Sequence, residues 1–77
     1  MKLSEARARK LFAVGKLAEA VGISRGHLYG IEGGRWLPSL ETVRKISEAL
    51  EIQDPMEIDE FKAAIEKSIR GKEPARG

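Results

Sequence analysis

Residues 17–34 read LAEAVGISRGHLYGIEGG and predict two short helices that meet at Gly22. The small side chain of Ala18 lets the two helices approach each other closely, and Gly22 can take the positive φ that ends the first helix. Ser24 is a favourable N-cap for the second helix. A pair joined by so tight a turn is expected to cross at roughly 90–120°, so one face of the second helix projects from the protein.

The projecting face of this second helix contains the candidate functional residues. Leu28 and Ile31 lie three residues apart and are expected to face the core. The opposite face then carries Arg25, Gly26, Tyr29 and Gly30. A protruding helix in a basic part of a small protein fits the major groove of DNA, which is about 12 Å wide.

Glycine and proline divide the chain into helical segments, and no strand pattern occurs. We expect helices over residues 3–14, 16–21, 24–32, 39–50 and about 55–70, with a bend near Ile58 in the last of them. In the first helix the expected inward-facing residues are Ala6, Leu11 and Val14. The predicted fold class is therefore all-α, a compact bundle of about five short helices.

The chain length allows one small domain. We assign residues 1–70 to that domain and expect residues 71–77 to form a flexible tail. Charge is divided unevenly along it: residues 1–46 hold nine basic and four acidic residues, whereas residues 47–77 hold five basic and eight acidic residues. This asymmetry suggests a first part that faces a polyanion and a second part with another role.

The composition argues against an enzyme. The chain of 77 residues has no cysteine and one histidine, so it has almost no material for a metal site built on cysteine or histidine or for acid–base catalysis by histidine. The glycines form no phosphate-binding motif, and we expect no catalytic residue, no metal and no cofactor. No run of about eighteen apolar residues occurs and the acid at Glu5 interrupts any apolar signal segment, so we expect no membrane partner. Because cysteine is absent, a cytoplasmic location is the default expectation.

From about Arg7 to Ile52 the sequence resembles the phage-repressor and Cro-like (XRE) helix-turn-helix transcription regulators. The resemblance rests on residues that match the family at several fixed spacings: Ala18, Gly22, Leu28, Ile31, Glu32, Gly34, Pro38-Ser39-Leu40 and Ala49-Leu50. It implies a helix-turn-helix at about residues 14–33 that binds double-stranded DNA, most commonly as a repressor. The DNA-binding residues it implies are Ser24, Arg25, Gly26, Tyr29, Gly30 and Arg35. It also implies a structural ion pair between Arg7 and Glu32.

The sequence departs from the family pattern where DNA is contacted. Val14 stands where the family usually has a glutamine, and Gly26 and Gly30 remove two side chains from the reading face. Two interpretations follow. Close approach of the helix to the groove could combine with DNA shape to give specificity, or the domain could have become a protein-interaction module without specific base reading.

Two further features each allow two interpretations. Trp36 either packs over the end of the core or contacts a partner or the DNA backbone. The apolar residues of the last helix, Met56, Phe61, Ile65 and Ile69, either close a thin core or take part in a two-fold interface. We expect a homodimer, because proteins of this kind read paired half-sites.

Overall fold

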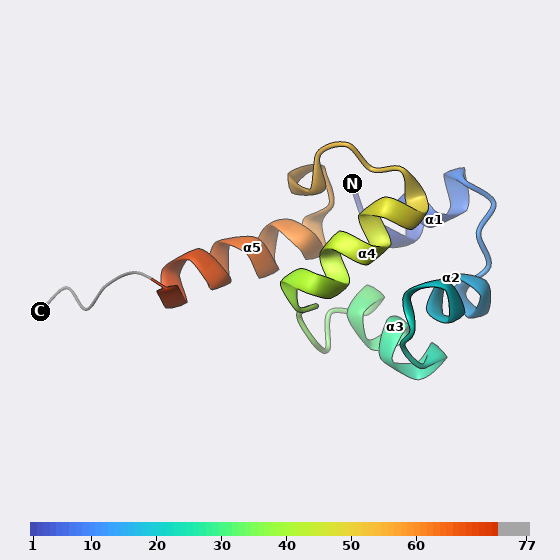
Figure 1. Ribbon diagram of the computed structural model, residues 1–77, viewed down its shortest axis with the longest axis horizontal. Helices are drawn as coiled ribbons and strands as arrows, with labels where there is room; N and C mark the ends of the chain where they lie inside the picture. The colour runs from blue at the N-terminus through green and yellow to red at the C-terminus, as the bar shows by residue number, and fades with distance from the viewer. Residues whose placement is uncertain (73–77) are drawn as a thin grey trace, which may run out of the picture.

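The computed structural model describes residues 1–72, with side chains for residues 1–69. The element order is α1 (Leu3–Arg9), α2 (Val14–Val21), α3 (Arg25–Glu32), α4 (Leu40–Leu50), the 3-10 helix η1 (Pro55–Glu57) and α5 (Asp59–Lys72). The described residues contain no strand, which confirms the expected all-α fold (Figure 1). Helix α5 extends two residues beyond the expected boundary at residue 70. Residues 73–77 of the expected tail lie outside the described chain.

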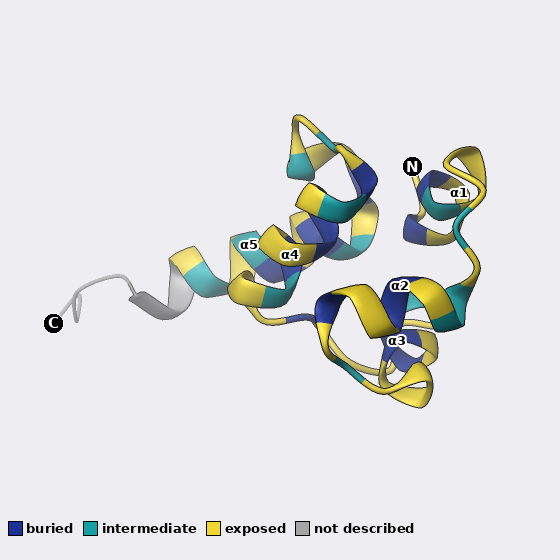
Figure 2. Cartoon of the chain, turned by 45° about the vertical axis from the view of Figure 1, so that its right-hand side comes forward, coloured by how far each residue is buried: buried dark blue, intermediate teal, exposed yellow. Residues whose placement is uncertain are grey.

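The buried side chains of α2, α3 and α4 form the part of the core that fixes the direction of α3. Their buried apolar side chains are Leu17, Ala18, Val21, Leu28, Ile31, Val43, Ile46 and Leu50, and the outward faces of the same helices are largely exposed (Figure 2). Gly22 ends α2 with φ of 78°. Its left-handed conformation lets the chain turn within three residues and start α3 at Arg25.

Side-chain caps define the first turns of α3 and α4. The Ser24 hydroxyl accepts a hydrogen bond from the His27 amide at 3.0 Å, and the Ser39 hydroxyl accepts one from the Thr42 amide at 3.1 Å. Each bond satisfies an amide that has no partner within its own helix. The two helices therefore begin where the sequence predicts.

The expected helix over residues 3–14 is wrong in its second half. Helix α1 ends at Arg9, and Leu11 takes a left-handed φ of 56°. The turn lets Phe12 pack against the core, whereas Leu11 is 93% exposed instead of facing inward. Helix propensity favoured continuation here, but the chain must fold back so that α2 can pack against α3 and α4.

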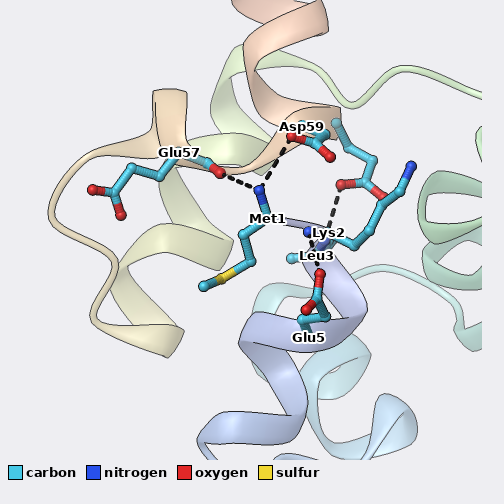
Figure 3. A network of polar contacts seen from close by, with 7 residues as sticks. Met1, Lys2, Leu3, Glu5, Glu57 and Asp59 are labelled. Carbon is cyan, nitrogen blue, oxygen red and sulfur yellow. Dashed lines mark hydrogen bonds and ion pairs between the residues drawn. The ribbon is translucent and has the colours of Figure 1, made fainter.

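The first residues of the chain join α1 to the start of α5 (Figure 3). The Met1 nitrogen donates to the Glu57 carbonyl at 3.0 Å and lies 3.2 Å from a carboxylate oxygen of Asp59. The Leu3 amide donates to the Glu60 carboxylate at 2.9 Å. This network holds η1 and the start of α5 against α1, while the rest of α5 points away from the bundle (Figure 1).

An ion pair between Arg7 and Glu32 links α1 to the end of α3. Arg7 Nε and Nη2 donate to the two carboxylate oxygens of Glu32 at 2.8 and 3.2 Å, and Arg7 Nη1 donates to the Phe12 carbonyl at 3.0 Å. These bonds to Glu32 raise the pKa of Arg7, although burial opposes the shift. The Glu32 side chain is only 8% exposed, so its charge depends on this partner.

We expect Glu32→Gln to lower the free energy of unfolding by about 2 kcal/mol, because the substitution leaves the Arg7 charge partly buried without its counter-ion. Glu48→Gln is the matched control, since Glu48 pairs with Arg44 at the surface and both side chains are more than half exposed. This control should change stability by less than about 0.5 kcal/mol. Urea denaturation followed by circular dichroism measures both values, and equal losses would contradict the structural role of the pair.

Candidate nucleic-acid interface

Helix α3 presents a continuous exposed face. Arg25, Gly26, His27 and Tyr29 are exposed on it, whereas Leu28 and Ile31 are buried on the opposite side. Tyr29 is 55% exposed, so its ring is not part of the core. Three of the four residues expected on the projecting face, Arg25, Gly26 and Tyr29, are therefore accessible to a partner.

The Arg25 side chain lies across the start of α2. A Cβ placed on Gly15 would lie 2.9 Å from Arg25 Nη2 and 3.1 Å from its Nε, so only a glycine leaves this position open in the observed geometry. A shallow groove between the two helices is lined by Ala13, Val14, Gly15, Lys16, Glu19, Arg25 and Tyr29. The α2 N-cap residue, Ala13, provides no capping side chain. The groove therefore combines two cationic side chains, Lys16 and Arg25, and the positive end of α2 with one carboxylate, Glu19.

Gly30 lies on the expected outward side of α3 but is covered by another residue. It is buried, because the indole of Trp36 lies directly against it, and a Cβ at position 30 would overlap ring carbons Cε3 and Cζ3 of Trp36. The Gly30 carbonyl also accepts the backbone N–H groups of Arg35 and Trp36, at 2.8 and 3.4 Å. Gly30 therefore supports the following loop rather than offering an open surface. By contrast, a Cβ at Gly26 would meet no atom within 4 Å.

The Trp36 ring joins α3 to the loop before α4. The His27 ring packs edge-on to it, with centroids 5.7 Å apart and planes at 80°, and the Arg35 guanidinium carbon is 6.0 Å from its centroid. This cluster was not predicted. A glycine on the outward side of a helix, followed six residues later by a tryptophan, is the only sequence signal for it.

Ser24 and Arg35 are brought to one surface depression. It is lined by Ser24, Gly26, His27, Arg35 and Trp36, and no acidic residue is among them. Ser24 and Arg35 are both exposed, and the Ser24 oxygen that caps α3 still has a hydroxyl proton to donate. Glu32, the one acidic residue of α3, forms an ion pair with Arg7. The depression can therefore accept an anion without opposition from a lining carboxylate.

No cluster of three or more potential metal ligands occurs among the described residues. Within the same part of the chain, no helix has both the length and the apolar character needed to cross a bilayer.

Comparison with protein families supports the geometry of α2 and α3. A family model for a helix-turn-helix domain matches residues 2–61, which include both helices and the core that holds them. The expected family resemblance is thereby confirmed. No curated protein and no solved structure matches the chain.

Gly26 and Gly30 should respond oppositely to alanine. Gly26→Ala should raise the free energy of unfolding by up to about 1 kcal/mol, because alanine favours the helix and the added methyl has open space. Gly30→Ala should lower it despite the same gain in propensity, because the methyl displaces the Trp36 ring. Thermal unfolding measures both, and a stabilising Gly30→Ala would show that the ring does not rest on this glycine in solution.

Proposed function

The chain belongs to this helix-turn-helix domain family, and from that membership we propose that it is a sequence-specific transcriptional regulator, most simply a repressor that covers its operator. Helix α3 enters the major groove of double-stranded DNA. The observation that carries the proposal is the exposed face of α3, where Arg25 and Tyr29 are accessible while the neighbouring acid, Glu32, is neutralised by Arg7.

Arg25 and Tyr29 are the proposed base-contacting side chains. A guanidinium can donate two hydrogen bonds to guanine, and the tyrosine ring can contact a thymine methyl. Arg25 reaches the bases by leaving its position over Gly15, which a long exposed side chain does at small cost. Because Gly26 carries no side chain, the backbone of α3 can approach the groove floor closely there, so DNA shape adds to the specificity.

Ser24 and Arg35 are the proposed phosphate contacts. Both are exposed at the edge of α3 and line the depression that has no acidic residue. The start of α2, with Lys16 beside it, is suited to a second phosphate. These contacts fix the register of α3 on the duplex but do not read sequence.

A homodimer is part of the proposal, since two base-reading side chains per subunit give limited discrimination. Two subunits can occupy half-sites about 34 Å apart on one side of the duplex. Helix α5 supports this arrangement: it points away from the bundle, and Ile69 near its end is 59% exposed (Figure 1). Regulation of transcription also agrees with the expected cytoplasmic location.

We expect Arg25→Ala to weaken binding to the preferred duplex by about 1–3 kcal/mol and to relax the preference at one base position. The control is Lys67→Ala, which removes an exposed positive charge on α5 and should change affinity by much less. Fluorescence anisotropy with labelled duplexes, chosen by random-oligonucleotide selection, measures both. An equal loss on all duplexes would assign Arg25 to phosphate contact.

Salt dependence separates DNA binding from the alternative function. A DNA-binding domain should show a linear fall of log affinity with log salt concentration, with a slope set by the number of phosphate contacts. No detectable binding at low salt would reject the proposal and favour a protein-interaction module.

The proposed dimer predicts a specific effect of Ile69→Glu. A charge at this exposed apolar position should weaken self-association at least tenfold, as measured by sedimentation equilibrium. Ala63→Glu places the same charge at another exposed position of α5, about 120° away around the helix, and should leave association unchanged. A wild-type protein that is monomeric at all concentrations and on its operator would reject the dimer.

A further inference from the structure

The middle of the outward face of α3 carries no side chain of its own. Gly26 and Gly30 lie there, four residues apart and therefore adjacent on the helix surface. Arg25 and Tyr29 each precede one of these glycines by one residue, so both lie on the same side of the line that joins the two glycines. The half of the face around Gly30 is filled instead by Trp36, which comes from the following loop.

The Trp36 ring is held in a defined orientation. Its carbons Cε3 and Cζ3 face Gly30, which places the indole nitrogen at the opposite edge of the ring system. The side chain is half exposed, and none of the hydrogen bonds formed among residues 1–69 uses the indole N–H. An indole N–H is only a donor, so a partner must supply an acceptor oxygen or nitrogen.

We propose that Trp36 is a DNA-contacting residue whose indole N–H donates to a backbone phosphate oxygen. This inference rests on the proposed function. A ring seated on the outward side of α3 is carried to the wall of the major groove whenever α3 enters it. A phosphate is favoured over a base edge because Arg35 and Ser24 line the same depression and no carboxylate does.

Gly30 acquires a different role in this arrangement. It does not face the bases; its missing side chain makes room for the indole, and its carbonyl holds the amides of Arg35 and Trp36. The glycine therefore positions both the Trp36 ring and the backbone that carries Arg35. The surface that contacts DNA consists of α3 together with the loop that follows it.

Intrinsic fluorescence tests the contact directly, because Trp36 is the only tryptophan of the chain. Wild-type protein is titrated with an end-labelled duplex while tryptophan emission and label anisotropy are recorded together. We expect the emission to change in parallel with the anisotropy and acrylamide to quench Trp36 less in the complex. Leu37→Ala is the control, because it alters a neighbouring exposed loop residue and should leave the emission change intact.

Trp36→Phe tests the hydrogen bond, because phenylalanine keeps an aromatic ring and lacks the N–H donor. We expect about a tenfold loss of affinity, by the same factor on preferred and unrelated duplexes, with an unchanged salt slope. Circular dichroism of the variant confirms that it is folded.

The outcomes separate this inference from the proposed function. Anisotropy that reports binding while Trp36 emission and quenching stay constant overturns the inference and leaves the function intact. A Trp36→Phe loss confined to the preferred duplex would mean a base contact and overturn the phosphate assignment. If anisotropy never changes, the proposed function fails and the inference fails with it.

Discussion

The bidentate ion pair between Arg7 and Glu32 is the interaction on which the exposed surface of α3 depends. It connects α1 to the last residue of α3, and Arg7 also bonds the carbonyl of Phe12, where the chain turns toward α2. One guanidinium thus joins α1, the turn that follows it and the end of α3. The same contact removes a free carboxylate from the end of the helix that would otherwise repel DNA phosphates.

The outward surface of α3 combines contributions from three parts of the chain. The helix contributes Arg25 and Tyr29, the start of α2 contributes Gly15 beneath Arg25, and the loop contributes Trp36 above Gly30. In two places a glycine accommodates a large side chain from another segment: Gly15 of α2 lies beneath Arg25, and Gly30 of α3 lies beneath Trp36. Glycine costs helix stability at positions 15 and 30, and close side-chain packing offsets part of that cost.

Features that depend on local chemistry could be predicted from the sequence, whereas features that depend on the path of the chain could not. The Ser24 cap, the positive φ of Gly22 and the inward faces of Leu28 and Ile31 follow from neighbouring residues, and the structure contains all of them. The turn at Leu11 and the packing of Trp36 on Gly30 depend instead on where distant elements lie. Arg7 and Glu32 could be paired from the sequence only through the family resemblance, since 25 positions separate them.

Under the proposed function, the contrast between Gly26 and Gly30 bears on how the DNA-facing surface could be redesigned. Position 30 is closed to new side chains while the indole rests there, so variation at this site would disturb the loop before it altered recognition. Position 26 has open space beyond its Cα and lies on the same outward line. Asparagine, glutamine or lysine at this one position would therefore place a polar side chain on the outward side of α3 without displacing another residue.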